Sequence, residues 1–169
     1  EEDESVQDHP FDFLCRHAAK GALIASIGAL AAAYGSQIFG GLAPCVLCLY
    51  QRIPYAIVIG LGLIALTLEY QGREDLAWNL LPISGFAFLV GSGIAGFHVG
   101  VEQHWWQGTE ACVGSSGATT LADLEAQIMA SPVTRCDEAP WSLFGISMAG
   151  YNMVASLTLA VFCAVAMQQ

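Results

Sequence analysis

The sequence predicts an all-α, membrane-embedded four-helix bundle, on the basis of its low charge and of where the charges are missing. Only 12% of the 169 residues are charged, about half of the roughly 25% typical of a soluble domain. No charged residue occurs in four runs, residues 21–51, 53–68, 76–101 and 139–169. Because a bilayer core takes roughly 20 apolar residues per helix, each run accommodates one span. The alternative is a soluble bundle, but these runs leave little room for solvated helix faces.

The predicted spans divide the chain into one membrane domain, residues 1–169, with short connections. We expect the spans near Gly21–Gly40, Cys48–Leu68, Ala77–Val101 and Phe144–Met167. The remaining segments are an acidic tail at 1–18, a first outer loop at 41–47, an inner loop at 69–76 and a second outer loop at 102–143.

The few cations predict the orientation in the membrane. Arg16, Lys20 and Arg73 fall on one side of the bilayer, whereas Arg135 is alone in the second outer loop. Since Lys and Arg favour the cytoplasmic side, both termini are predicted to be cytoplasmic and loops 41–47 and 102–143 to face outward. The formal net charge of −10 argues against a nucleic-acid partner, because a phosphate backbone attracts cations.

The six cysteines sort by this topology into two groups. Cys15 falls on the reducing side and Cys163 within the fourth span, so we interpret both as packing residues. The other four fall on the outer side, where disulfides persist, as one pair in each outer loop: Cys45, Cys48, Cys112 and Cys136.

The first pair belongs to the segment "PCVLCLYQR" at the start of the second span. Pro44 suits the first turn of a helix, which would place Cys45 and Cys48 one turn apart on one face. Arg52 follows Cys48 by four residues and would stack on the same face. A helix N-terminus and a guanidinium both favour the thiolate form of Cys48.

Two other interpretations of this segment stay open at this point. Arg52 could extend to lipid head groups, as cations at span ends often do. The cysteines could also contribute to a zinc site, but a closed zinc site needs four ligands and Arg52 would repel the ion. We therefore predict no metal.

The second pair lies in a loop that also contains a predicted short amphipathic helix, from Thr120 to Met129, lying along the membrane surface. A Cys112–Cys136 bridge would close a loop of about 25 residues and could contribute roughly 3–4 kcal/mol as a structural staple. The neighbouring Cys45 and Cys48 favour a second interpretation, in which disulfide exchange links the two pairs.

The four spans, the Cys-x-x-Cys-x-x-x-Arg segment, the outer cysteine pair and the "CDEAPW" stretch at Cys136 together resemble the disulfide bond formation protein B (DsbB) family. The resemblance covers nearly the whole chain from Ala19 onward. It implies a protein-dithiol:quinone oxidoreductase of the bacterial inner membrane. The implied cofactor is ubiquinone or menaquinone, and the implied partners are membrane lipid and a periplasmic, thioredoxin-fold dithiol oxidase (DsbA-like).

The resemblance also implies a catalytic order for the cysteines. The reduced oxidase would attack the Cys112–Cys136 bridge at Cys112, and Cys136 would then attack Cys45. Cys48 would leave as a thiolate, which Arg52 would hold against the quinone. The sulfur with the lower pKa is the better leaving group in such exchanges, which agrees with this order.

Three further residues are candidate quinone contacts. Gln37 lies near the outer end of the first span, where the family's pattern has a glutamine. His98 and Glu102 lie one turn apart at the outer end of the third span, and a histidine at membrane depth is a functional candidate. In the fourth span, Tyr151 and Asn152 are expected to form interhelical hydrogen bonds.

Two alternatives compete with this interpretation. A vitamin K epoxide reductase-like protein also joins Cys-x-x-Cys to quinone chemistry, but in that family the motif lies late in the bundle, whereas here it opens the second span. A four-span scaffold with two stabilising disulfides leaves Arg52 unexplained.

Overall fold

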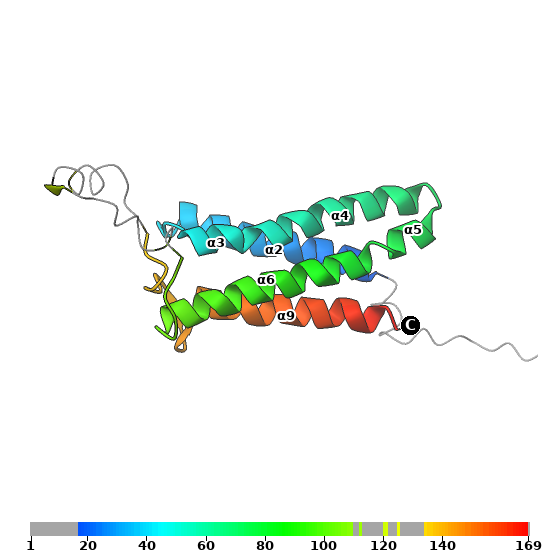
Figure 1. The fold of residues 1–169 in the computed structure, drawn as a ribbon. Helices are drawn as coiled ribbons and strands as arrows, with labels where there is room; N and C mark the ends of the chain where they lie inside the picture. The colour runs from blue at the N-terminus through cyan, green and yellow to red at the C-terminus, as the bar shows by residue number, and fades with distance from the viewer. Residues whose placement is uncertain (1–16, 110–111, 113–119, 122–124, 126–133, 169) are drawn as a thin grey trace, which may run out of the picture.

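A computed structural model describes residues 17–109, 112, 120–121, 125 and 134–168, and the long helices lie side by side in one bundle (Figure 1). The ends of the bundle differ. Residues 134–147 and the start of α3 (Val46–Tyr50) lie at one end, which we call the cysteine end, and the C-terminus and residues 71–73 lie at the other. The helices are α2 (Ala18–Ile38), α3 (Val46–Tyr50), α4 (Arg52–Tyr70), α5 (Glu74–Trp78), α6 (Leu81–Glu102) and α9 (Met148–Ala166).

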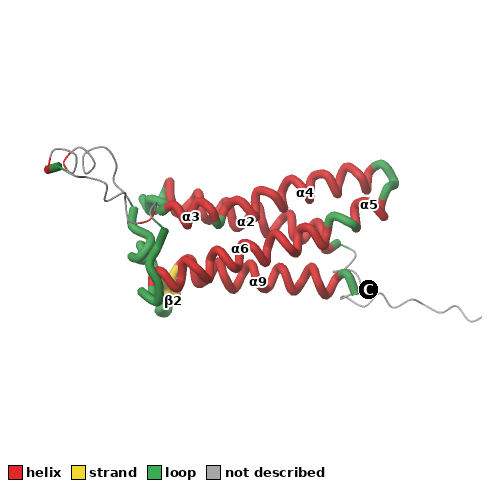
Figure 2. Tube along the Cα trace, viewed as in Figure 1, coloured by secondary structure: helices red, strands yellow, loops and turns green. Residues whose placement is uncertain are grey.

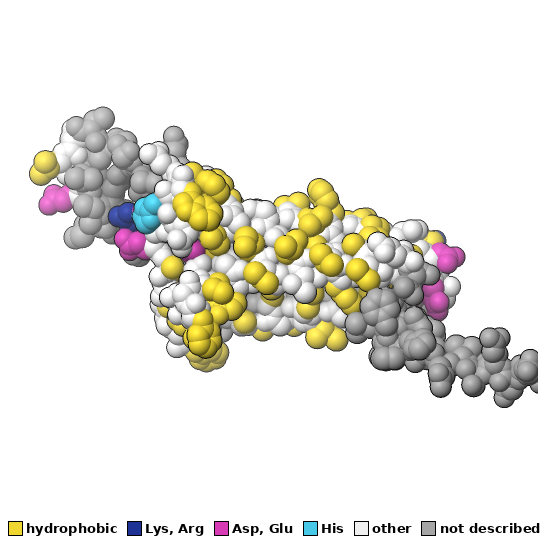
Figure 3. Space-filling view, turned by 90° about the horizontal axis from the view of Figure 1, so that it is seen from below, with side chains coloured by type: hydrophobic (Ala, Val, Ile, Leu, Met, Phe, Trp, Pro, Cys, Tyr) yellow, Lys and Arg dark blue, Asp and Glu magenta, His cyan; other side chains and the backbone are white. Residues whose placement is uncertain are grey.

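Four helical segments are long and apolar enough to cross a membrane, namely Ala18–Ile38, Val46–Tyr70, Glu74–Glu102 and Met148–Ala166. Large hydrophobic side chains such as Ile24 and Phe86 are exposed on their outer surfaces. Figure 3 shows hydrophobic side chains along the middle of one face and charged side chains gathered at the two ends. This distribution suits a bilayer around the middle of the bundle. The predicted all-α bundle of four spans is confirmed.

The start of the fourth span was predicted wrongly. The helix begins at Met148 and not at Phe144, because residues 142–147 form an antiparallel hairpin of β1 (Ser142–Leu143) and β2 (Ile146–Ser147) (Figure 2). Phe144 and Gly145 both have positive φ, which a two-residue turn of this kind requires. Ser147 then caps α9, since its Oγ accepts a hydrogen bond from the Gly150 amide.

The buried core combines small residues, such as Ala87 and Ala160, with two aromatic rings. Phe88 of α6 is fully buried and meets Tyr55 of α4 edge to face, with ring centroids 5.9 Å apart. Helix α6 packs most extensively on α9, and α2 packs on α4. Cys163 is buried in this core, consistent with its interpretation as a packing residue.

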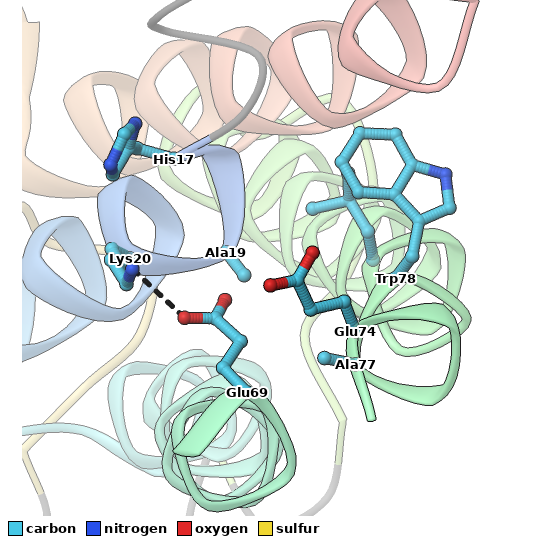
Figure 4. A pocket seen from close by; sticks show the side chains of 8 residues that line it. His17, Ala19, Lys20, Glu69, Glu74, Ala77 and Trp78 are labelled. Atoms are coloured by element: carbon cyan, nitrogen blue, oxygen red, sulfur yellow. Dashed lines mark ion pairs between the residues drawn. The ribbon is translucent and has the colours of Figure 1, made fainter. Parts of the chain in front are cut away.

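A cavity of about 290 Å³ with a mixed polar and apolar lining lies at the opposite end from the cysteines. Figure 4 shows the side chains that line it. Lys20 of α2 forms an ion pair with Glu69 of α4, with Nζ and Oε2 2.8 Å apart. The pair joins the first and second spans where both leave the apolar region. Glu74 and Trp78 line the same cavity.

Several predicted features fall outside the described residues. These are most of the acidic tail, Cys15, Arg16 and most of the amphipathic helix predicted between Thr120 and Met129.

Adding one methyl group at Gly62 should separate α2 from α4. A Cβ at this position would lie 2.9 Å from Leu23 Cβ and 3.1 Å from its Cδ1. We expect Gly62→Ala to lower the free energy of unfolding by about 1–3 kcal/mol, as overpacking does. The matched control is Gly60→Ala, on the same helix, where a Cβ meets nothing within 4 Å. Equal melting temperatures of the two variants in detergent would contradict this packing.

Candidate functional site

Both outer cysteine pairs lie together at the cysteine end. Cys112 and Cys136 form a disulfide with their Cα atoms 5.2 Å apart. Cys45 and Cys48 are free thiols whose sulfur atoms lie 2.7 Å apart. Cys45, Cys112 and Cys136 belong to one buried cluster with Leu47 and Val101, and Cys48 packs against it. The cluster brings together sulfur atoms from loops far apart in the sequence.

Cys45 caps the helix that carries Cys48. Its backbone is extended (φ −79°, ψ 172°), and its Sγ accepts a hydrogen bond from the Cys48 amide at 3.2 Å. Helix α3 begins at Val46, one residue after its cap, close to the start near Pro44 or Cys45 considered from the sequence. The sulfur takes the role of a capping oxygen and satisfies an amide that has no partner within the helix.

The two thiols of the pair are not equivalent. The hydrogen bond between the two sulfur atoms, together with burial, raises the pKa of Cys45 well above its ordinary value. Cys45 therefore holds its proton more firmly than a free thiol does.

Arg52 contacts α2 and not the Cys48 sulfur. Its Nη1 donates to Gln37 Oε1 at 3.0 Å, and its guanidinium carbon lies 4.5 Å from the centre of the Tyr34 ring. Among the described residues no hydrogen bond joins Arg52 to Cys48, which differs from the stacking expected from their spacing. The reason is that α2 presents an amide and an aromatic face within reach, and both bind a guanidinium well.

Cys48 and Arg52 nevertheless line the same cavity, which has a volume of about 260 Å³. Ala29, Leu30, Ala33 and Ala155 supply apolar walls from α2 and α9, and His98 and Glu102 supply polar groups from α6. Gln37 is not among the described residues that line it. It holds Arg52 in place at the cavity wall.

A chain of hydrogen bonds between buried and half-buried side chains connects the cavity wall to the core. Gln51 Nε2 lies 2.8 Å from His98 Nδ1, and Gln51 Oε1 accepts from Asn152 Nδ2 at 2.6 Å. Asn152 Oδ1 in turn accepts from the Tyr55 hydroxyl at 2.6 Å, and this hydroxyl lies 2.8 Å from Ser156 Oγ. The chain joins α4, α6 and α9 through groups that would otherwise be costly to bury.

The direction of these bonds assigns the His98 tautomer. Because Gln51 Oε1 accepts from Asn152, Gln51 Nε2 donates to His98 Nδ1. The imidazole proton is then on Nε2, which lies 3.6 Å from Cys45 Sγ and 3.8 Å from Glu102 Oε1. The other oxygen of Glu102 accepts a short hydrogen bond from Ser147 Oγ. His98 thus points an N–H group at the cysteine pair.

A second arginine near the cysteines is neutralised. Arg135 Nε and Nη2 donate to the two carboxylate oxygens of Asp137, at 2.9 and 2.5 Å. These hydrogen bonds lower the pKa of Asp137 to about 2. Glu138 Oε1 is a further 3.6 Å from Arg135 Nε. Arg135 adjoins Cys136 in sequence, but its charge is already paired.

Comparison with known proteins assigns the family. A family model described as "Disulfide bond formation protein DsbB" matches residues 16–166. The chain belongs to the DsbB family.

Individual relatives agree with this assignment. The chain is 30% identical over 141 residues to a disulfide bond formation protein B of Xylella fastidiosa, covering 79% of each chain. It is 28% identical over 137 residues to one of Dechloromonas aromatica, covering 76% of this chain and 77% of the relative. It is also 27% identical over 140 residues to an uncharacterized protein of Rickettsia prowazekii, covering 81% and 78%. No solved structure gave a significant match.

Membership of the DsbB family makes this protein a multi-pass membrane oxidoreductase of disulfide bond formation. At the cysteine end, Cys48 packs against the cluster of Cys45, Cys112 and Cys136, and Cys48, Arg52 and His98 line one cavity.

Several residues of this site were not identified from the sequence. Gln51, Tyr55 and Ser156 were not singled out, although a polar side chain within an apolar span is itself a signal. Tyr34 was missed because an aromatic residue in a span is usually packing. Asn152 forms the interhelical bonds predicted for it, whereas the Tyr151 hydroxyl donates to the Leu143 carbonyl of the hairpin and not to another helix.

Removing the Tyr55 hydroxyl should weaken the hydrogen-bond chain. Tyr55→Phe leaves Asn152 Oδ1 without its donor and Ser156 without its partner, and we expect a loss of about 1 kcal/mol in unfolding free energy. Tyr151→Phe is the matched control, because its hydroxyl bonds an exposed loop carbonyl. The measurement is the melting temperature in detergent. An equal fall in both variants would contradict a stabilising role for the buried hydrogen-bond chain.

Proposed function

We propose that this chain re-oxidises a periplasmic, thioredoxin-fold dithiol oxidase (DsbA-like) and passes the electrons to a membrane quinone. In the proposed topology, residues 1–169 form one domain in the bacterial inner membrane. Both termini are cytoplasmic and the cysteine end faces the periplasm. Family membership supports the disulfide chemistry, and the arrangement of the cysteine end supports the electron path.

The observation that carries the proposal is the position of Cys48 between the cysteine cluster and the cavity. Cys48 packs on the cluster that holds the Cys112–Cys136 disulfide, and it also lines the 260 Å³ cavity. Cys45 is not among the described residues that line the cavity. Cys45 thus faces the cluster and Cys48 faces the cavity. This arrangement suits transfer of electrons from the Cys112–Cys136 disulfide to a ligand within the bundle.

The cavity fits a quinone by the chemistry of its lining. Alanine and leucine side chains of α2 suit an apolar ring, and Arg52 offers N–H donors to a carbonyl oxygen. When bound, a quinone supplies the acceptor for the two electrons and two protons released as the Cys45 and Cys48 thiols become a disulfide. Arg52 would stabilise negative charge on this side of the cavity, and His98 would hold a proton at Nε2.

The proposed order of exchanges follows from the burial of the cysteines and from which sulfur of each pair is attacked. Cys112 is only 3% exposed and Cys136 is fully buried. The thiolate of the partner can therefore attack Cys112 only after the chain around it moves away from the cluster. Cys136, once released, would attack Cys45 of an oxidised Cys45–Cys48 disulfide, because Cys45 lies in the same cluster. The bond between Cys45 and Cys48 would break, so Cys48 would leave as the thiolate. Once the partner's second thiol has released Cys112, Cys112 would re-form its bridge to Cys136 and free Cys45, which leaves the pair reduced.

The direct test is electron flow in a purified system. The protein in detergent, a ubiquinone or menaquinone analogue and a reduced DsbA-like partner are mixed, and quinone absorbance is followed. We expect one quinone reduced per partner dithiol oxidised. Absence of quinone reduction, with the partner still reduced, would overturn the proposal and favour a scaffold whose disulfide only stabilises the outer loop.

A further inference from the structure

We propose that the reduced Cys45–Cys48 pair and His98 form a site for a thiophilic divalent cation, Zn²⁺, which exists only while the pair is reduced. Cys45 Sγ, Cys48 Sγ and the imidazole of His98 offer one ligand atom each, all within 4.8 Å of one another. Two thiolates and an imidazole are preferred zinc ligands, and three protein ligands leave the fourth position open. This donor set differs from the four-ligand zinc site weighed from the sequence, because it needs neither Cys112 nor Cys136.

The distances in the reduced pair are close to those that zinc requires. At usual bond lengths, a sulfur and a nitrogen on tetrahedral zinc lie about 3.5 Å apart, and Cys45 Sγ lies 3.6 Å from His98 Nε2. Two sulfurs on zinc lie about 3.8 Å apart, against 2.7 Å between Cys45 and Cys48. The thiols must therefore separate by about 1 Å, which a side-chain rotation of half-buried Cys48 provides.

The charges around the site balance when zinc is bound. The reaction is two thiols plus Zn²⁺ giving a zinc dithiolate and two released protons, which leaves the metal and its two sulfurs neutral. Glu102, close to His98, and Arg52, held by Gln37 and Tyr34, carry opposite charges at the same cavity. The repulsion from Arg52 expected from the sequence is therefore offset by Glu102.

Zinc binding requires donors and acceptors to exchange roles along the buried hydrogen-bond chain. A metal on Nε2 moves the His98 proton to Nδ1, so the Gln51 amide must turn its oxygen toward the ring. Asn152 and the Tyr55 hydroxyl can follow, because amides and hydroxyls both donate and accept. A carboxylate at position 51 accepts from Nδ1 without any turn. Gln51→Glu should therefore bind zinc more tightly.

The consequence for turnover rests on the proposed function. Zinc would occupy both sulfurs that give up electrons, so the reduced pair could not return to a disulfide until the metal leaves. The oxidised pair offers no thiolate and would not bind. Zinc would thus inhibit the enzyme in its reduced state.

The test measures metal binding without a quinone. Full-length protein carrying Cys112→Ser and Cys136→Ser is reduced, freed of reductant and titrated with Zn²⁺ against a colorimetric chelator. Cd²⁺ serves as a probe through its thiolate charge-transfer absorbance. We expect one ion per reduced chain and none after oxidation of the pair. His98→Asn should weaken binding about 10-fold or more, Cys45→Ser should abolish it, and Gln51→Glu should strengthen it about 10-fold.

The matched control is His104→Asn, which alters an exposed histidine at the same end and should leave the zinc affinity unchanged. Equal affinity in the His98→Asn protein, or binding to the oxidised pair, would show adventitious metal only and overturn the site. Quinone reduction by intact protein in excess chelator tests the proposed function separately. If the protein with Cys112→Ser and Cys136→Ser does not fold, a second measurement is made on protein that keeps the Cys112–Cys136 disulfide. Inhibition of its quinone reduction by Zn²⁺ is compared with and without His98→Asn. Equal inhibition in the two proteins would overturn the site.

Discussion

Replacing Cys48 with serine should reduce quinone-dependent oxidation of the partner by about 1,000-fold or more, to the background rate. Cys48 is the sulfur that lines the cavity, and a serine hydroxyl forms no disulfide with Cys45. Half-buried Cys48 contributes little to the core, so the melting temperature in detergent should change little. The measurement is the initial rate of quinone absorbance change with reduced partner in excess.

The control for this variant is Cys163→Ala, which removes a free cysteine that is buried in the core far from the site. We expect it to keep electron transfer, although its stability can fall. A Cys48→Ser protein that still reduces quinone at the parental rate would rule out the pair as the electron path. In that case the cysteines at this end serve only as structural elements.

Arg52→Ala should lower kcat/KM for quinone by about 100- to 1,000-fold, the usual cost of losing one electrostatic stabiliser. The variant removes the only charged donor among the described residues of the cavity wall. We expect most of the loss as a higher quinone KM, which steady-state kinetics measure.

Two further variants separate the charge of Arg52 from its position. Gln37→Leu keeps the guanidinium but removes the amide that holds it, so a smaller loss in quinone affinity is expected. Arg135→Ala removes an arginine already paired with Asp137 and should leave quinone kinetics unchanged. If Arg52→Ala also left the quinone KM unchanged, the role proposed for Arg52 would be wrong.

The features that sequence predicted well are local ones. Runs without charge gave four spans whose ends differ from the helices by only a few residues, because the hydrophobic requirement of a bilayer acts on every residue of a run. The pairing of Cys112 with Cys136 also matches the structure, since topology left few partners for them. The start of α9 was missed because the turn at Phe144 and Gly145 uses a non-glycine residue at positive φ.

Features that depend on contacts between neighbouring helices were harder to predict from the sequence. The spacing of Cys48 and Arg52 suggested direct contact, but Tyr34 and Gln37 of α2 bind the guanidinium instead. Nothing in the sequence near Arg52 reports which face of α2 it meets. The Gln51–His98 bond likewise joins residues 47 positions apart. Such contacts follow from helix packing, which a single sequence does not reveal.

The most direct test of the central claim uses the Cys45–Cys48 pair alone. Full-length protein with Cys112→Ser and Cys136→Ser is reduced, freed of reductant and mixed with a quinone analogue in the absence of any partner. The account predicts two thiols lost per quinone reduced, with a Cys45–Cys48 disulfide found by mass spectrometry. The opposite result would be quinone reduction by the intact protein but none by the folded, reduced protein that lacks Cys112 and Cys136. That result would contradict the account.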